Sequence, residues 1–278
     1  MAKNINPKET PKGFKTLSGF INYKGTPIHY TDQGKGRVVV LLHGFLENLG
    51  MWNAIVPELA KKNRVIAIDL LGHGKSGNLG YIHTMEDQAQ MVKALLNHLK
   101  LHRYFLIGHS LGGYISLAFA ETYPKNVKGI CLMNSTAIAD DKEKRINRDR
   151  AILAVKRNHK MVVKVAIPNL FAEENREIHK EKIKLLIDEA LELSPQGIIA
   201  SLEGMKIRKY RTYLLRSNDF QRMLIIGKKD PVLDYESLIK QTKGTNVKVI
   251  EFPDGHMSHI ENKEALILAL KDFVKSCN

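Results

Sequence analysis

The chain has 278 residues, and its 44% hydrophobic content is enough for one enzyme-sized core, which favours a single domain with an insertion over two separate folds. Two cysteines, Cys131 within an apolar stretch and Cys277 near the last residue, argue against a disulfide framework or a cysteine metal site. The net charge of +14 raises the question of a nucleic acid, anionic surface or acidic protein partner.

The opening nine residues carry no apolar stretch, and no later segment is long enough and uncharged enough to cross a bilayer. We therefore expect a cytoplasmic protein with no membrane span.

Hydrophobic patterning predicts strands that alternate with helices. Residues 16–31 are expected to form two strands with a turn at Lys24 and Gly25, followed by a third strand over 38–42. Helices are predicted over 54–61 and from Thr84 onward, with Asp87 as the capping partner of Thr84. Further strands are predicted over 65–69, 104–107, 222–227 and 247–252. This alternation favours a mostly parallel sheet covered on both faces, which binds ligands at the carboxyl ends of its strands.

The alternation stops between Asn134 and Arg222. This stretch is predicted to be helical, with charged residues between apolar ones.

A glycine-flanked serine lies between a predicted strand and a predicted helix. Gly108-His109-Ser110-Leu111-Gly112 directly follows the apolar residues 104–107. This is the context of a serine nucleophile on a strained strand-to-helix turn, where the flanking glycines leave room for the neighbouring backbone. The helix that starts there would also direct unpaired N–H groups at a reacting carbonyl. We therefore assign Ser110 as a nucleophile, with His109 as a residue that fills the turn.

A serine nucleophile needs a base and a carboxylate that orients the base. Asp230 follows the predicted strand over 222–227, and His256 follows the one over 247–252, so Ser, Asp and His occur in a suitable order. Asp234 is the nearby substitute for Asp230. His259 is the rival base, but it lacks a preceding glycine, so His256 is preferred.

Three more segments carry a family resemblance. Residues 38–42 lead into His43-Gly44-Phe45, residues 69–76 form a glycine-rich turn, and residues 255–259 carry the downstream histidine. Together with the serine turn, these segments resemble those of α/β-hydrolase fold enzymes, in the esterase-like branch with a helical cap. The resemblance implies a mostly parallel eight-stranded sheet, a core of residues 1–135 and 221–278, and a cap of residues 136–220. It also implies that the backbone N–H groups of Phe45 and Leu111 form the oxyanion hole.

These assignments predict a serine hydrolase that cleaves carboxylic esters or thioesters through an acyl-enzyme, without a cofactor or metal. A carbon–carbon bond hydrolase and a cofactor-free perhydrolase of the same fold are the alternatives. An alternative of another class is a receptor-like binding protein with little turnover. The serine at position 110 disfavours branches of the family that use an aspartate nucleophile.

The residues that contact substrate are less defined by the sequence. Glu47 is expected to be either solvated or directed into the cleft, and His43 to shape the oxyanion loop. Apolar side chains over Ser110 would decide specificity, although each could instead pack inside the cap. The candidates for the cleft are Glu47, Tyr114, Ile167, Leu170 and Phe171, with Leu202 and Met205 as further cap candidates.

The basic residues are scattered, usually beside acidic ones, and accompany no nucleic-acid motif, so no nucleic acid partner is expected. They form either a solvated surface or a docking face for an acidic acyl carrier protein. The oligomeric state is left open. The densest groups lie in the predicted cap: Lys142, Lys144, Arg145, Arg148 and Arg150, then Lys206, Arg208, Lys209 and Arg211.

Overall fold

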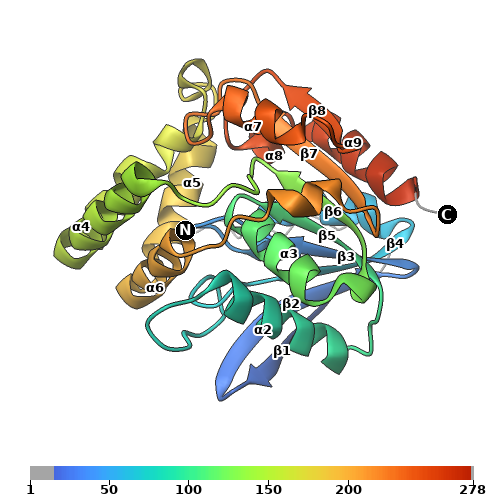
Figure 1. Ribbon diagram of the computed structural model, residues 1–278. Helices are drawn as coiled ribbons and strands as arrows, with labels where there is room; N and C mark the ends of the chain where they lie inside the picture. Colours follow the sequence, from blue (N-terminus) through green and yellow to red (C-terminus); the bar gives the residue numbers. More distant parts are fainter. Residues whose placement is uncertain (1–15, 277–278) are drawn as a thin grey trace, which may run out of the picture.

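The computed structural model describes residues 16–276, so the opening nine residues and Cys277 lie outside the described part of the chain (Figure 1). Within that part, one eight-stranded sheet has the order β1-β2-β4-β3-β5-β6-β7-β8. β1 and β2 pair antiparallel, as do β2 and β4, and the other neighbours pair parallel. The strands are β1 (Leu17–Tyr23), β2 (Thr26–Gly34), β3 (Arg37–Leu42), β4 (Asn63–Ile68), β5 (Tyr104–His109), β6 (Val127–Met133), β7 (Gln221–Gly227) and β8 (Lys248–Phe252).

Helices follow the strands in the alternation that the sequence predicts. The α-helices are α1 (Val56–Ala60), α2 (Met85–His98), α3 (Leu111–Thr122), α4 (Lys142–Ala166), α5 (Lys180–Leu191), α6 (Pro195–Lys206), α7 (Tyr235–Thr242), α8 (Ser258–Glu261) and α9 (Lys263–Lys275). Short 3₁₀ helices cover Leu49–Trp52, Pro124–Asn126, Pro168–Leu170, Glu173–Asn175 and Thr212–Arg216.

Two local predictions can be compared directly with the structure. The Thr84 side chain caps α2 by accepting the backbone N–H of Asp87 at 3.0 Å, as predicted. The helix predicted over 54–61 is shorter, because α1 begins only at Val56, with Pro57 in its first turn. Proline suits the first turn of a helix because its missing N–H would have no partner there.

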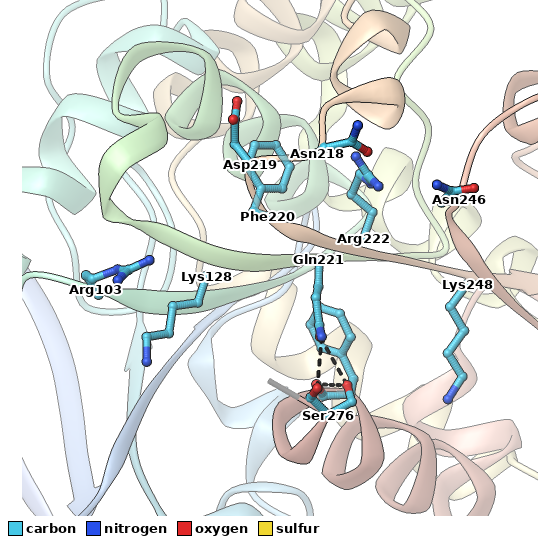
Figure 2. Close-up of a pocket in the computed structure, with 11 residues that line it drawn as sticks. Arg103, Lys128, Asn218, Asp219, Phe220, Gln221, Arg222, Asn246, Lys248 and Ser276 are labelled. Atoms are coloured by element: carbon cyan, nitrogen blue, oxygen red, sulfur yellow. Dashed lines mark hydrogen bonds between the residues drawn. The ribbon is translucent and has the colours of Figure 1, made fainter. Parts of the chain in front are cut away.

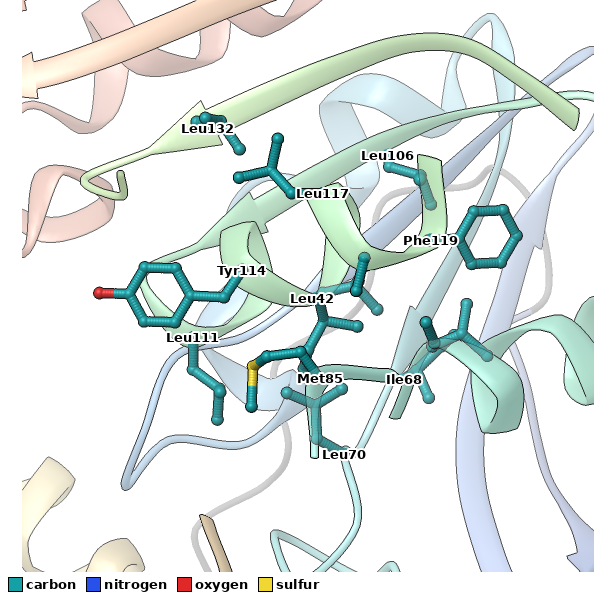
Figure 3. Packing of buried hydrophobic residues seen from close by; sticks show 14 of the residues in the cluster. Leu42, Ile68, Leu70, Met85, Leu106, Leu111, Tyr114, Leu117, Phe119 and Leu132 are labelled. Carbon is teal, nitrogen blue, oxygen red and sulfur yellow. The ribbon is translucent and has the colours of Figure 1, made fainter. Parts of the chain in front are cut away.

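The sheet is buried on both faces, because alternate residues of the central strands enter different clusters. Val40 and Leu42 of β3 pack with α2 and α3, whereas Val39 and Leu41 pack with α1 and α9. Figure 3 shows the first of these clusters, where Leu106 and Leu132 of neighbouring strands lie near Leu117 and Phe119 of α3. This packing fixes the strand ends that carry the predicted site residues. Cys131 is fully buried in β6, and burial raises the pKa of its thiol.

The helical segment predicted between β6 and β7 contains α4, α5 and α6, which gather at one side of the sheet (Figure 1). α4 has a kink at Asn158, where φ is −158° and ψ is 84°. α6 lies directly against the core, because a Cβ on Gly197 or Gly204 would come within 3.0 Å of the backbone of Gly72 or His83. In residues 16–276 no helix combines the length and apolar character that crossing a membrane requires.

Candidate active site

Ser110 occupies a strained turn between β5 and α3. Its φ of 48° and ψ of −110° lie outside the regions that L-residues ordinarily adopt. A Cβ on Gly108 would come within 3.0 Å of the Gly112 backbone, and one on Gly112 would meet the Leu42 carbonyl of the neighbouring strand at a similarly short distance. Both flanking glycines are therefore needed for close backbone packing, as the sequence predicts.

Asp230 and His256 come together at the carboxyl edge of the sheet. The Nδ1 of His256 donates to Oδ2 of Asp230 at 2.7 Å, and both side chains are almost fully buried. Burial alone would raise the pKa of Asp230, but the charge and hydrogen bond of His256 outweigh burial and lower it. The ring of His256 lies 5.0 Å, centroid to centroid, from that of His109, which precedes Ser110. His256 is thus beside the serine turn, although no hydrogen bond from the Ser110 hydroxyl occurs among the bonds of residues 16–276.

Asp234 and His259, the alternatives to Asp230 and His256, make different contacts. Asp234 caps α7 by accepting the Ser237 N–H at 2.8 Å. His259 lies in α8 and is buried, and burial lowers its pKa to about 4, so its ring is neutral at pH 7. Of the two carboxylates, Asp230 is the one that contacts His256.

Asn134 is a site residue that the sequence reasoning missed. It follows β6 with a φ of 45°, and its amide donates to Oδ2 of Asp230 at 3.3 Å and to the Gly255 carbonyl at 3.1 Å. The backbone N–H groups of Val232 and Leu233 donate to the other oxygen of Asp230, at 2.9 and 3.1 Å. The carboxylate is therefore fixed on both oxygens. An asparagine at a strand end beside the serine strand is the signal that could have identified this residue.

The predicted oxyanion loop follows β3. His43 donates from Nδ1 to the Gly44 carbonyl at 2.8 Å and accepts the Leu70 N–H at Nε2, at 3.0 Å, so its ring shapes the loop as expected. Burial lowers the pKa of His43, which keeps the ring neutral. Leu111 is the first residue of α3, where backbone N–H groups have no partner within the helix.

Glu47 is neither solvated nor exposed in a cleft. Its Oε2 accepts the Gly44 N–H at 2.6 Å and contacts Nδ1 of His109 at 2.8 Å. Nε2 of His109 donates to the His256 carbonyl at 3.0 Å. Glu47, His109 and His259 form the one group of described residues with three closely spaced ligand atoms, all within 4.8 Å. Both ring nitrogens of His109 are already hydrogen-bonded, to Glu47 and to the His256 carbonyl, which leaves neither of them as a ligand for a metal ion.

The predicted cleft residues differ in burial. Ile167 and Phe171 are almost fully buried, Leu170 is partly buried, and the Leu170 carbonyl accepts the His256 N–H at 2.9 Å. Tyr114 lines a cavity of about 240 Å³ between α3, α4 and the residues after Asp230. The other residues lining this cavity are Asp140, Lys144, Asn147, Arg148, Ala151, Leu202, Arg208, Val232 and Leu233. The predicted cap residue Leu202 therefore borders the same space as the core residue Tyr114.

A larger cavity of about 560 Å³ lies away from these residues (Figure 2). Lys128, Gln221 and Lys248, at the amino-terminal ends of β6, β7 and β8, line it together with Ser276 after α9. Because none of the predicted site residues borders it, we place the candidate site at the opposite, carboxyl edge of the sheet.

Comparison with known proteins identifies the family. Residues 37–263 match the family described as alpha/beta hydrolase fold. The chain belongs to this family. A thermophilic esterase from Thermogutta terrifontis has a similar structure, with a TM-score of 0.85 and 29% identity over 93% of this chain and 98% of that one.

Two curated relatives from Pseudomonas putida are also similar. The dihydrolipoyllysine-residue acetyltransferase component of an acetoin cleaving system is 29% identical over 248 residues, which cover 86% of this chain and 64% of the relative. A 2-hydroxy-6-oxo-2,4-heptadienoate hydrolase is 35% identical over 131 residues, 46% of each chain. The matches thus span less than two thirds of both relatives.

Proposed function

We propose that this α/β-hydrolase cleaves carboxylic esters or thioesters with Ser110 as nucleophile, His256 as base and Asp230 as the carboxylate that orients the base. The observation that carries the proposal is the 2.7 Å bond between Asp230 and His256, beside the strained serine turn. A carboxylate on Nδ1 holds the imidazole in the tautomer whose Nε2 can accept a proton. The esterase among the structural relatives supports the choice of ester substrates.

In the proposed reaction, His256 takes the Ser110 proton as the serine oxygen attacks the substrate carbonyl carbon. The N–H groups of Phe45 and Leu111 stabilise the oxyanion, and Asp230 stabilises the imidazolium. His256 then protonates the leaving alcohol or thiol, which departs. Water, deprotonated by the same histidine, attacks the acyl-enzyme, and collapse of the second oxyanion releases the acid and restores Ser110. No step requires a cofactor.

We assign residues 136–220 as a cap over this site. The cavity shared by Tyr114 and Leu202 supports that assignment, because it lies between the helical segment and the loop that follows Asp230. The apolar side chains among its mixed lining, such as Leu202 and Val232, would contact the acyl or leaving group and decide substrate length. A series of acyl esters and thioesters of graded length, assayed with the wild type and Leu202→Ala, tests this. A cap role predicts a changed length preference, and an unchanged one contradicts it.

The experiment that tests the proposal is active-site labelling with a fluorophosphonate probe. The folded wild type should form an adduct that Ser110→Ala lacks, whereas Ser237→Ala on α7 should label like the wild type. Short-chain p-nitrophenyl esters then measure turnover. A folded wild type without an adduct favours the binding-protein alternative and overturns the proposal. Turnover of a carbon–carbon substrate or of peroxide faster than of any ester would transfer the serine chemistry to one of the other two alternatives.

An acidic acyl carrier protein is a proposed partner, and α4 is the surface that would contact it. Nine of its 25 residues are Lys or Arg and two are Asp or Glu. Arg148 is already paired with Asp140, but Arg150 and Arg157 border a groove of about 440 Å³ on the same helix. Reversing the charge at both should slow hydrolysis of a carrier-bound acyl group and reduce its salt dependence, while small esters are unaffected. If the wild type and the charge-reversed variant hydrolyse carrier-bound substrate at equal rates, the basic residues of α4 form only a solvated surface.

A further inference from the structure

Three segments of the proposed site meet at one buried ion pair. Glu47 belongs to the loop after β3 that carries Phe45, and His109 directly precedes Ser110. Through His109 Nε2 the pair also contacts the backbone carbonyl of His256. The side chains of Glu47 and His109 are 2% and 1% exposed. The oxyanion loop, the nucleophile turn and the base loop are therefore connected by two side chains.

The protonation of the pair follows from its partners. The His256 carbonyl can only accept, so His109 carries a proton on Nε2. The Gly44 N–H donates to the same Glu47 oxygen that faces Nδ1 of His109, and an ionised carboxylate oxygen can accept both bonds. An imidazolium and a carboxylate satisfy all three contacts at once.

The charges around the pair favour this ionised form. Burial alone would raise the pKa of Glu47, but the charge and hydrogen bond of His109 outweigh burial and lower it to about 2. Burial alone would lower the pKa of His109, but Glu47 and the His256 carbonyl outweigh burial and raise it, with a smaller effect of Asp230. Both pKa shifts therefore favour the ionised pair.

The local packing leaves little freedom for another arrangement. A Cβ on Gly44 would lie 2.5 Å from Oε2 of Glu47 and 2.6 Å from Nδ1 of His109, so this position requires glycine. Oε1 of Glu47 is buried without a hydrogen-bond partner, as is Nδ1 of the neighbouring His259. Only the Oε2 atom of the Glu47 carboxylate is therefore hydrogen-bonded. A surface ion pair of the same type would contribute little to stability. When one member of a buried pair is removed, the other is left as an uncompensated buried charge.

We propose that the Glu47–His109 ion pair is a positioning device that holds the oxyanion loop and the base loop in their reactive arrangement around Ser110. The proposal rests on the function proposed above. Glu47 and His109 touch no reacting atom in this scheme and act through Phe45, Ser110 and His256. Their contribution depends on alignment, because displacement of a catalytic group by about 1 Å can cost ~100-fold in rate.

Glu47→Gln is the direct test. The glutamine oxygen can still accept from Gly44 and His109, but the amide carries no charge, so a charged His109 would lose its counter-ion, and the NH₂ group would take the buried place of Oε1, which has no hydrogen-bond partner. We expect kcat on a p-nitrophenyl ester to fall by about 10–100-fold while KM changes by less than about 3-fold. His109→Gln should have a similar effect. The kcat of the double variant should be at most about 3-fold lower than that of the slower single variant, because the two residues act as a unit.

Asp32→Asn is the matched control. Asp32 is a buried carboxylate that pairs with Arg64 at 2.7 Å between β2 and β4, and it has no contact with the site. Its replacement should leave kcat within about 2-fold of the wild type. If Glu47→Gln lowers kcat no more than Asp32→Asn, the positioning proposal is wrong. A fall confined to KM would also contradict it.

A measurement independent of these variants uses Ser110→Ala labelled with ¹⁵N-histidine. The ionised pair predicts that both ring nitrogens of His109 carry protons at pH 7, seen as two N–H signals in slow exchange with water. A single protonated nitrogen at pH 7 would overturn the proposal even if the substituted proteins fail to fold. Failure of the proposed function can be distinguished from failure of the positioning role. A wild type that forms no Ser110-dependent adduct contradicts both. An active wild type together with an unchanged kcat of Glu47→Gln contradicts the positioning role alone.

Discussion

Replacing Asp230 with asparagine changes one atom in the proposed site and should nearly abolish activity. One oxygen of Asp230 accepts the N–H groups of Val232 and Leu233, and the other accepts Nδ1 of His256. Asparagine must keep its oxygen on the two backbone donors, which directs its NH₂ group at His256. The ring then accepts on Nδ1 and carries its proton on Nε2, so it cannot take the proton of Ser110.

The expected loss in kcat is about 10⁴-fold, or about 5 kcal/mol of transition-state stabilisation. The amide of Asn134, 3.3 Å from the same oxygen, would face a second NH₂ group and weaken the arrangement further. Turnover of a p-nitrophenyl ester and the rate of fluorophosphonate labelling measure the effect. Asp234→Asn is the control, because Asp234 also follows β7 but caps α7, a role that asparagine retains. Activity of Asp230→Asn within 10-fold of the wild type would refute the assignment of this carboxylate.

Three further predictions concern stability and reactivity. Gly108→Ala should destabilise the fold by about 3 kcal/mol or more, seen as a lower midpoint of denaturant unfolding, because its Cβ would overlap the Gly112 backbone. Glu47 has a folded pKa of about 2 against 4.5 unfolded, so its ionisation contributes stability above pH 4.5 that disappears as the pH falls through 2. The stability difference between wild type and Glu47→Gln should thus shrink by about 3 kcal/mol between pH 5 and 2, and a constant difference would contradict the buried pair. Cys131 should not react with a thiol reagent until the protein unfolds, because it is fully buried and burial raises the pKa of its thiol. The Cys277→Ser variant isolates the reaction of Cys131, and rapid labelling of this variant while folded would contradict the prediction.

The elements that the sequence predicts well are those specified by local patterns. The serine turn is marked by glycines whose absence of a Cβ is required by backbone contacts, and the capping of α2 is marked by Thr84 and Asp87. The same holds for the strands, since the apolar runs over 38–42 and 222–227 lie within β3 and β7. In each case a few neighbouring residues determine the conformation, so no knowledge of distant partners is needed.

The parts that were missed depend on strand order. Glu47 and His109 are 62 positions apart, and they meet because β3 and β5 are neighbours in the sheet. Asn134 reaches Asp230 across 96 positions because β6 and β7 are neighbours. Alternation of strands and helices predicts a parallel sheet but does not say which strands adjoin. An acidic or amide residue just past a strand therefore has several candidate partners until the order is known.

Two of the described non-glycine residues with positive φ lie at strand ends whose side chains the proposed chemistry uses, and the others are Lys24, Leu46 and Lys100. Ser110 and Asn134 both have positive φ, at a cost of about 1–3 kcal/mol each. Backbone hydrogen bonds to adjacent strands hold both residues: Ser110 N–H donates to the Met133 carbonyl at 2.9 Å, and Asn134 N–H donates to the Ile225 carbonyl at 3.0 Å. The hydroxyl of Ser135 also donates to the Ser110 carbonyl at 2.7 Å. Each strained residue is thus held by a backbone hydrogen bond to the neighbouring strand, and relaxation of either residue would break its own bond. The sheet thus holds Ser110 and the asparagine that contacts Asp230 at the ends of two neighbouring strands.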